Sequence, residues 1–267
     1  MNGNLPYRIG TTSFILADDY EPNLRFLADK TEDIALLFFE SIHDTTPPRW
    51  IETARKLQQE RDLTFSVHLP TDIRLGSSDE AVRSQAIESC VRIIQMLSPL
   101  APSAFVCHAD GDPDLPFAKS NQAALASSLR TLGKTCGDPR KICLENVRMS
   151  HDELRAALNE TEASICYDIG HALLRDQPIL DELSRWLPRC RVIHLHGVSG
   201  DRDHHPLDCL PPPLLDQILC LYASERGQPG RILTLELFNR TRWESSLITL
   251  REALNRPSAE ISSYLLS

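Results

Sequence analysis

Residues that commonly bind metal ions recur at the ends of short apolar stretches of this chain. The stretches read LTFSVH, AFVCH, ICLE, ASICYD, RVIHLH and ILTLE. The ligand-type residues at or near their ends are His68, His108, Glu145, Asp168, His194, His196 and Glu236. Imidazole nitrogens and carboxylate oxygens are the ligands expected for Zn²⁺, Mn²⁺ or Fe²⁺. A packed core has no use for this arrangement, so the pattern predicts a metal site.

Two polar clusters extend the set of candidate ligands. The sequence DIGH at 168–171 adds His171 around one turn from Asp168. The sequence DRDHH at 201–205 contributes two acids and two imidazoles shortly after the RVIHLH stretch. We expect these clusters to hold another ion beside the first, which gives two or three divalent ions in total.

The distribution of histidine separates this hypothesis from a structural explanation. A single His or Asp at the end of a strand more often serves structure, for example by capping the next helix. Seven of the nine histidines, however, lie at these stretch ends or in the two clusters: His68, His108, His171, His194, His196, His204 and His205. Random placement would also scatter histidines over the helices, so the joint pattern favours a site.

The carboxylates in this set are expected to take a direct part in catalysis. Carboxylates bridge two ions readily, and either Glu145 or Glu236 suits that role. Two ions about 3.5–4 Å apart stabilise the entering and leaving oxygens of a displacement at phosphorus, and coordination lowers the pKa of water to about 7. We therefore assign Glu145, Asp168 and Glu236 as catalytic residues in the hydrolysis of a phosphoester.

The sequence indicates the residues that contact the substrate less specifically than it indicates the metal ligands. Several arginines follow the apolar stretches, and we expect Arg148 and Arg240 to bind a phosphate group. Thr12 and Glu40 lie at the C-terminal ends of the first two predicted strands, Tyr7–Thr12 and Ile34–Glu40, so both are expected to line the pocket. The structural alternatives are solvated loop charge for the arginines and turn or cap chemistry for the other two.

The elements that would position these residues alternate along the whole chain. Eight apolar stretches are predicted strands: Tyr7–Thr12, Ile34–Glu40, Leu63–His68, Ala104–His108, Ile142–Glu145, Ser164–Asp168, Val192–His196 and Leu233–Glu236. A segment with helical periodicity follows each one, which is typical of βαβ units and a parallel sheet. The length of 267 residues fits a barrel of about 250. We predict one (β/α)₈ TIM barrel over residues 1–267, with the strand-end residues at its C-terminal mouth.

An open doubly wound sheet is the alternative to a barrel. That fold normally carries a glycine-rich phosphate loop after its first strand. The corresponding turn here reads IGTTSF and contains one glycine. The 197–213 segment is expected to be a long irregular loop, and such loops in compact barrels are often functional.

Composition narrows the class of partner. The chain is 42% hydrophobic and 24% charged, with a formal charge of −9. No basic stretch of the kind that binds nucleic acid is visible, and no apolar run approaches the roughly 18 residues of a membrane helix. The eight cysteines form no C-x-x-C pair. We therefore expect a cytoplasmic protein with reduced cysteines that binds a small-molecule substrate, neither nucleic acid nor membrane, in an undetermined oligomeric state.

The order of the candidate ligands resembles the xylose isomerase-like barrel superfamily, most closely its type IV apurinic endonuclease branch. Those enzymes carry a three-metal cluster and cleave phosphodiesters. The resemblance implies that His68 and His108 bind one ion and share Glu145 with a second. It further implies that the second ion is completed by Asp168, His194 and Glu236.

The third ion would be held by His171 with an Asp and a His from the DRDHH loop. The endonucleases read Asp-x-His there, and the loop of this chain has an extra residue. Either Asp201 or Asp203, and either His204 or His205, is then the ligand, and we take Asp203 and His205. The stretch RVIHLH carries two histidines, so the second of them, His196, competes with the first and is included as a ligand.

Other parts of the sequence are similar to the cobamide remodeling phosphodiesterases. The similar segments read RIGTTSFI, DIALLFFES, LTFSVHLPTDIRLG and VIHLHGV. Members of that group cleave a phosphoester in the nucleotide loop of B12-type cofactors and give a cobinamide-type product. The resemblance implies this activity here. The alternatives are a DNA repair endonuclease, a metal-dependent sugar isomerase or epimerase, and a binding protein without turnover.

Overall fold

Eight parallel strands close into a barrel in the computed structural model, which describes residues 5–41, 46–112, 116–224 and 226–256. The ring order is β1-β10-β7-β6-β5-β4-β3-β2, and β1 closes the ring by pairing with both β10 and β2. The barrel strands are β1 (Tyr7–Thr12), β2 (Asp33–Leu37), β3 (Thr64–His68), β4 (Phe105–Cys107), β5 (Ile142–Glu145), β6 (Ser164–Asp168), β7 (Cys190–Leu195) and β10 (Arg231–Leu235). Each overlaps one predicted strand, so the predicted TIM barrel is confirmed.

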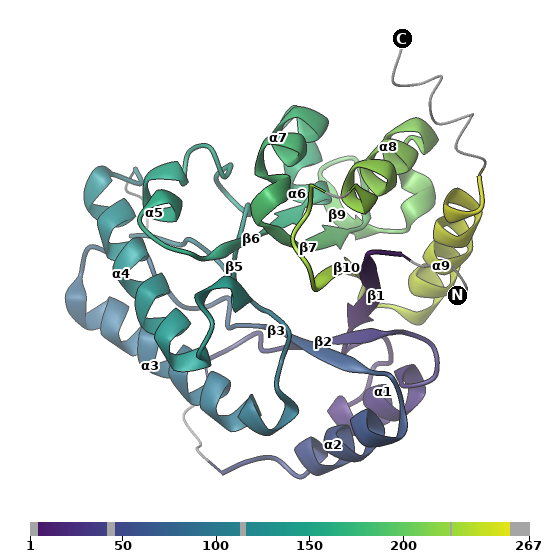
Figure 1. Ribbon diagram of the computed structural model, residues 1–267, viewed down its shortest axis with the longest axis horizontal. Coiled ribbons are helices and arrows are strands. Elements are labelled where there is room, and N and C mark those ends of the chain that lie inside the picture. Colours follow the sequence, from purple (N-terminus) through teal and green to yellow (C-terminus); the bar gives the residue numbers. More distant parts are fainter. Residues whose placement is uncertain (1–4, 42–45, 113–115, 225, 257–267) are drawn as a thin grey trace.

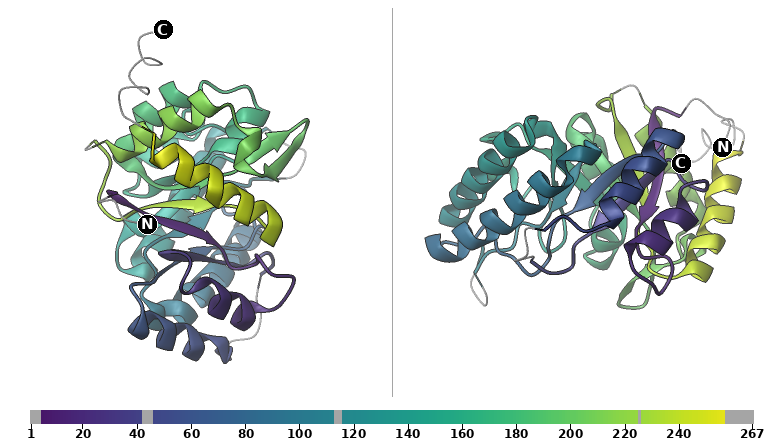
Figure 2. Two further views of the ribbon diagram at one scale, coloured as in Figure 1. Left: turned by 90° about the vertical axis from the view of Figure 1, so that its right-hand side faces the viewer. Right: turned by 90° about the horizontal axis from the view of Figure 1, so that it is seen from below.

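Helices surround the strands, as Figure 1 and the two turned views of Figure 2 show. They are α1 (Tyr20–Leu27), α2 (Trp50–Glu60), α3 (Glu80–Leu97), α4 (Lys119–Cys136), α5 (Arg155–Asn159), α6 (Ile169–Leu174), α7 (Ile179–Trp186), α8 (Pro212–Ala223) and α9 (Arg240–Leu254). Local signals set several of their ends. The side chain of Asp79 accepts hydrogen bonds from the first turn of α3, and Gly137, with φ of 77°, ends α4. In the described part of the chain, no helix is long and apolar enough to cross a membrane.

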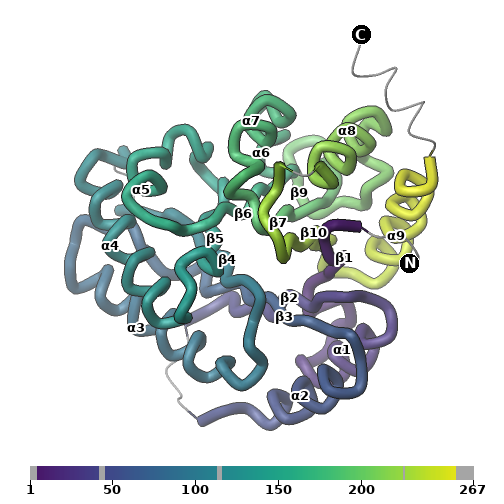
Figure 3. Tube along the Cα trace, viewed as in Figure 1, coloured from purple at the N-terminus to yellow at the C-terminus, as the bar shows by residue number. Residues whose placement is uncertain are grey.

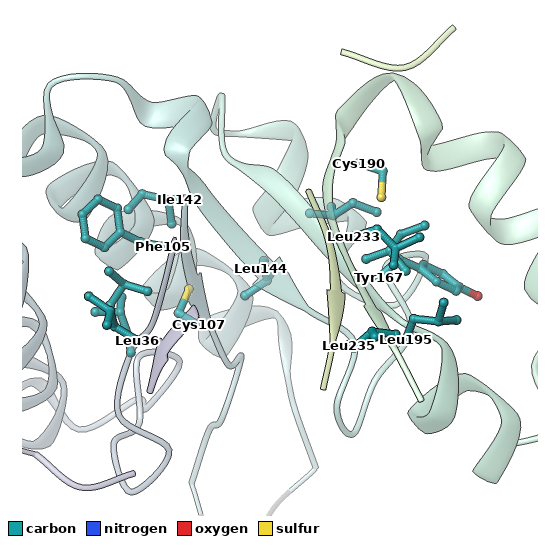
Figure 4. Close-up of a cluster of buried hydrophobic side chains, with 14 of the residues drawn as sticks. Leu36, Phe105, Cys107, Ile142, Leu144, Tyr167, Cys190, Leu195, Leu233 and Leu235 are labelled. Atoms are coloured by element: carbon teal, nitrogen blue, oxygen red, sulfur yellow. The ribbon is translucent and has the colours of Figure 1, made fainter. Parts of the chain in front are cut away.

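Side chains alternate between the two faces of each strand, and this alternation produces two separate apolar layers. Residues such as Phe105, Ile142, Leu144 and Leu233 belong to the large cluster between strands and helices, part of which is drawn in Figure 4. Their neighbours along the strands form a second, smaller cluster: Ala104, Val106, Cys143, Cys166, Val192 and Ile232. Successive strand residues point to opposite faces, so this second cluster fills the inside of the barrel.

The same period of two carries the ligand-type residues into the barrel mouth. Two positions beyond Val106, Cys143 and Cys166 come His108, Glu145 and Asp168. Residues separated by two positions in a strand point to the same face. The inner apolar layer therefore forms a floor, and the charged residues lie above it at the C-terminal ends of the strands.

The segment after β7 is more regular than the sequence predicted. Instead of an irregular loop, it forms an antiparallel pair of β8 (Gly197–Ser199) and β9 (Arg202–His205), followed by a short 3₁₀ helix. The prediction was wrong because the strands are only three and four residues long and mostly polar, too short to show a period. The pair follows β7 directly along the chain, and Figure 3 labels β9 next to β7.

Candidate metal centre

The ends of three neighbouring strands bring together a first group of ligands. Oε2 of Glu145 lies 3.2 Å from Nε2 of His68 and 3.1 Å from Nε2 of His108. Glu145 is almost fully buried, and both imidazoles are at most slightly exposed. Two imidazole nitrogens and a carboxylate oxygen at these separations form a group able to hold a divalent ion.

A second group adjoins the first through the other oxygen of Glu145. Oε1 of Glu145 lies 2.7 Å from Nδ1 of His194. The same nitrogen lies 3.1 Å from Oε2 of Glu236 and 3.8 Å from Oδ2 of Asp168. All four side chains are buried, and their candidate ligand atoms lie within 4.8 Å of one another. Glu145 thus offers one oxygen to each group, in the geometry of a bridging carboxylate.

A third group lies at the edge of the mouth, between α6 and the β8–β9 pair. It consists of His171, Asp203 and His204. Nε2 of His171 is 3.4 Å from Oδ2 of Asp203, and Nε2 of His204 is 3.7 Å from Oδ1 of the same residue. His196 lies between this group and the second, with its Nε2 3.1 Å from Oδ2 of Asp168.

The structure resolves which members of the DRDHH loop reach the site. Asp203 and His204 belong to the third group, and His204 also forms a group with His196 and Glu236. None of the groups formed by the described residues contains His205 or Asp201. The structure therefore brings His204, rather than the expected His205, to the centre. His204 has a positive φ of 52°, a left-handed conformation that a sequence pattern does not reveal.

Backbone contacts orient several of these rings. Nδ1 of His68 lies 2.8 Å from the carbonyl of Leu69, and Nδ1 of His204 lies 3.1 Å from the carbonyl of Glu236. A ring that donates from Nδ1 keeps Nε2 unprotonated, which is the form that binds a metal. Asn146 links two strand ends, because its side chain donates to the carbonyl of Asp168 and accepts from the amide of Asp168.

Opposite charges control ionisation in the ion-free centre. Burial opposes the ionisation of Glu145, but the charge of His194 and hydrogen bonds from His108 and His68 outweigh it and hold its pKa well below the usual range. Burial likewise disfavours charge on His108, but Asp110 and Glu145 raise its pKa to about 10. Protons on the imidazoles thus balance the carboxylates when no cation is bound.

The donor set fits divalent ions, as a buried oxygen of Glu236 indicates. Oε2 of Glu236 is buried and has no hydrogen-bond partner among the described residues. His194 lies near this oxygen, but not with hydrogen-bond geometry. A buried polar atom without a partner costs about 1–3 kcal/mol. Coordination of an ion by Oε2 of Glu236 would remove that cost.

The groups open into a pocket of about 250 Å³ at the barrel mouth. His68, His108, Glu145, His171 and Glu236 are among its lining residues. The rest of its wall is largely apolar, with Leu37, Phe38, Phe39, Val147 and Phe238. A charged floor beneath an apolar wall suits a substrate whose reactive group is charged and whose neighbouring part is not.

The expected substrate residues take different positions. Arg148 lies beside the mouth, with 82% of its side chain exposed and its Nε 3.5 Å from Oδ1 of Asp110. Glu40 is exposed and lines an apolar groove next to the pocket. These two positions are compatible with substrate contact.

Thr12 and Arg240 are not brought to the pocket. Thr12 is fully buried, and its hydroxyl donates to the carbonyl of Leu237, because β1 packs against the chain beyond β10. Arg240 pairs with Glu244 one turn later in α9 and lies over the ring of Phe26. The expectation that these two residues bind substrate is therefore corrected.

Several residues of the site lie one to three positions beyond a strand end and were missed from the sequence. Asp110 is 3.6 Å from Nδ1 of His108, and Asn146 links the ends of β5 and β6. Phe39 and Phe238 form part of the pocket wall. Their positions just after β2, β4, β5 and β10 were the available signal.

Comparisons with known proteins agree with this architecture. The family model of the xylose isomerase-like TIM barrel matches residues 29–253. No curated protein sequence is significantly similar to the chain.

Solved structures with the same fold include two kinds of enzyme. A D-tagatose 3-epimerase-like protein superposes with a TM-score of 0.78 at 19% identity, over 97% of this chain and 99% of that chain. Endonuclease IV from Thermus thermophilus superposes with a TM-score of 0.70 at 18% identity, over 92% and 98%. A D-allulose 3-epimerase from Methylomonas sp. gives 0.68 at 14% identity, over 92% and 90%. Identities this low establish the fold alone.

Proposed function

Because the chain belongs to the xylose isomerase-like TIM barrel family, we propose that it is a metal-dependent phosphodiesterase of this family. Its substrate in this proposal is a cobamide, whose nucleotide-loop phosphoester is hydrolysed to give a cobinamide-type product. The substrate assignment is supported by the resemblance of four sequence segments to the cobamide remodeling phosphodiesterases. The reaction class is supported by the geometry of the centre.

The observation that carries the reaction class is the sharing of Glu145 between two ligand groups. Its two oxygens lie 3.1 Å from His108 and 2.7 Å from His194. A third group, which contains His171, adjoins them. An isomerase typically requires one ion that bridges two substrate oxygens, and most of these histidines would then lack a purpose. Adjacent ions suit displacement at phosphorus.

Divalent ions bound here would neutralise charge on the phosphoester and lower the pKa of water, as in other two-metal sites. The chain's own residues set the geometry. Glu145 fixes the spacing between the first two groups, and Asn146 holds the end of β5 against that of β6. Asp168 accepts a hydrogen bond from the amide of His171 and so couples the second group to the third. A substrate lying against the apolar wall with Phe238 would exclude bulk water from the centre.

The pocket is much smaller than a whole cobamide. A volume of about 250 Å³ accommodates the phosphoester and its nearest neighbours, so the bulk of the substrate would lie on the rim. Arg148, which is exposed and lines the neighbouring polar cavity, would contact anionic or amide oxygens of the substrate.

The test is incubation of the purified chain, reloaded separately with Zn²⁺, Mn²⁺ or Fe²⁺, with a cobamide and analysis of products by mass spectrometry. We expect a cobinamide-type product that disappears in His108→Ala and Asp168→Ala, while circular dichroism shows both variants folded. Cys220→Ser, on the exposed face of α8, should retain nearly normal activity. An intact cobamide, together with cleavage of another ester, would refute the substrate assignment.

A sugar epimerase is the second candidate, and the size of the pocket is the observation that favours it. At about 250 Å³ the pocket is slightly below the roughly 300–1,000 Å³ of typical ligand sites, which suits a substrate as small as a monosaccharide. Metal analysis discriminates between the two functions. One ion per chain, with interconversion of keto-sugars, supports the epimerase, and two or three ions support the phosphodiesterase.

An endonuclease acting on abasic DNA would use the same ligands. The formal charge of −9 opposes it, because contacts of Lys and Arg with phosphates dominate affinity for DNA. A nicking assay on abasic duplex DNA at low and moderate salt should therefore give no product.

A further inference from the structure

An apolar groove runs directly into the metal-centre pocket. It has a volume of about 500 Å³ and shares Leu37, Phe38 and Phe39 with the pocket. The groove lies between the loops that follow β1 and β2, and its remaining wall includes Phe14, Tyr20 and Trp50. Groove and pocket are thus one continuous surface.

Aromatic rings line this surface without a break. Starting at α2 and ending at a metal-centre residue, the centroid separations are 4.4 Å for Trp50–Tyr20, 4.9 Å for Tyr20–Phe14, 5.4 Å for Phe14–Phe39, 6.0 Å for Phe39–Phe238 and 4.8 Å for Phe238–His204. Each separation is within the range of direct ring contact. The last ring belongs to the third ligand group, so the aromatic surface leads to the reacting centre.

Two rings of this series are unusually exposed. Phe39 is 50% exposed and Phe238 is 38% exposed, and a ligand lying across the mouth would cover both rings. Contiguous exposed apolar surface next to a polar site is typical of a binding surface. Glu40 is a charged residue of the groove, and its carboxylate is a hydrogen-bond acceptor for an N–H at the edge of a ring.

A neighbouring cavity at the mouth has a different character. A cavity of about 460 Å³ begins at Thr71, which also lines the metal-centre pocket, and includes Arg74, Asp110 and Arg148. The pocket is therefore bordered by an aromatic groove and, beyond Thr71, by a polar cavity that carries charge. A diester with two unlike arms fits this asymmetry in one orientation.

We propose that the groove from Trp50 to Phe39 binds a flat, uncharged heteroaromatic ring system of the substrate, while the polar side receives the other arm. Stacking on aromatic side chains suits such rings because every planar base has a π-face. The assignment of this ring to one arm of a phosphodiester rests on the proposed function. The ring-binding site itself depends only on the groove.

The test uses the full-length, metal-free protein with benzimidazole as the probe. Trp50 lines the groove, whereas Trp186 and Trp243 are buried, so quenching of tryptophan fluorescence reports on the groove. We expect saturable quenching by benzimidazole, in the millimolar range typical of so small a ligand. Cyclohexanol, which lacks a π-face, should compete poorly, and Trp50→Phe should abolish the signal.

Two variants locate the ring. Phe39→Leu keeps the apolar surface but removes the π-face, and Phe14→Ala removes a ring from the middle of the series. Each variant should weaken benzimidazole binding roughly tenfold, which is the effect expected for the loss of one stacking contact. Ile248→Ala is the matched control, because Ile248 is an exposed apolar residue on α9 outside the groove. Quenching that persists in Trp50→Phe, or affinity unchanged in both groove variants, would overturn the proposal.

The two proposals fail separately. If benzimidazole binds as expected but cobamides are not cleaved, the groove stands and the substrate assignment falls. If cobamides are cleaved and the groove variants leave both KM and benzimidazole affinity unchanged, the groove proposal falls. If both stand, Phe39→Leu should raise KM for the cobamide about tenfold with little change in kcat.

Discussion

The adjacent residues His204 and His205 of the β8–β9 pair differ in the ligand-type side chains that lie near their rings. His204 lies near Asp203 and Glu236, whereas His205 enters none of the ligand groups of the described residues. We therefore expect His204→Ala to lose one bound ion per chain and His205→Ala to keep all of them. Elemental analysis of both purified variants measures this. Equal metal content in the two variants would contradict the assignment.

The charge of His108 should make the ion-free protein sensitive to alkaline pH. Its pKa is about 10 in the folded chain and about 6.5 when unfolded, so the folded state holds the proton more tightly. The resulting stabilisation is full below about pH 6.5 and is lost as the pH rises towards 10. Thermal unfolding in the presence of a chelator should show Tm falling across this window.

His108→Gln removes the titrating group and serves as the test variant. Its Tm should fall less steeply between pH 6.5 and 10 than that of the unmodified chain, since only the latter loses the His108 proton. His205→Gln is the control and should keep the full dependence. Identical slopes for all three proteins would show that His108 is uncharged in the ion-free state.

The individual ligands were predictable to the extent that the strands position them. His108, Glu145 and Asp168 end predicted strands, and the period of two places them on the inner face. The choice between His204 and His205 depended instead on a left-handed backbone conformation at His204. The hydroxyl of Thr12 donates a hydrogen bond to the carbonyl of Leu237 within the barrel wall. The two residues are far apart in the sequence, so the sequence does not reveal this contact.

The start of helix α6 packs directly against the ring of His196 in the centre. A Cβ built on Gly170 would lie 1.9 Å from Cε1 of His196, a ring that is fully buried. Gly170→Ala should therefore destabilise the fold by about 1–3 kcal/mol, the usual effect of overpacking. It should also weaken ion binding, because His196 contacts Asp168.

Gly137→Ala separates this effect from general backbone strain. Gly137 has a φ of 77° at the end of α4, and a Cβ there would meet nothing within 4 Å. Its cost should be limited to about 1–2 kcal/mol of conformational strain, with normal ion affinity. Urea unfolding and metal titration measure both quantities. Normal ion affinity in Gly170→Ala would show that His196 does not support the centre.

The strands of the barrel were predictable because each is an apolar run flanked by helical periodicity. β1, β5 and β6 match their predicted ranges, and the others differ by a few residues at their ends. The β8–β9 pair was not predictable, because Gly197–Ser199 and Arg202–His205 carry almost no apolar pattern. Gly197, which pairs with His205, also lies so close to the carbonyl of Pro206 that a side chain would not fit there, a contact that the sequence pattern does not show.

For the whole barrel, bound ions should contribute substantially to stability. Glu145, Asp168 and Glu236 converge around the imidazole of His194, and divalent ions would supply more compensating charge than imidazole protons do. At an ion concentration one thousandfold above Kd, binding stabilises the fold by about 4 kcal/mol. A chain of this size shifts by roughly 2–4 °C per kcal/mol. We expect chelation to lower Tm by about 10 °C.

Glu145→Gln provides the comparison for that measurement. The variant should lose most of the chelator-dependent change in Tm, because its side chain no longer carries the charge shared by two groups. Glu244→Gln, on the exposed side of α9, should keep the whole change. A chelator effect of equal size in both variants would indicate binding of ions away from the barrel mouth.

The two-sided position of Glu145 also has a thermodynamic consequence. An ion bound by His68 and His108 would fix the rotamer of this carboxylate, and the opposite oxygen would then already face His194. Binding of the first ion would therefore order the Glu145 ligand for the second ion. By thermodynamic reciprocity, the second ion would raise the affinity for the first. Titration curves should be sigmoidal, and partially loaded chains should be scarce at every intermediate concentration.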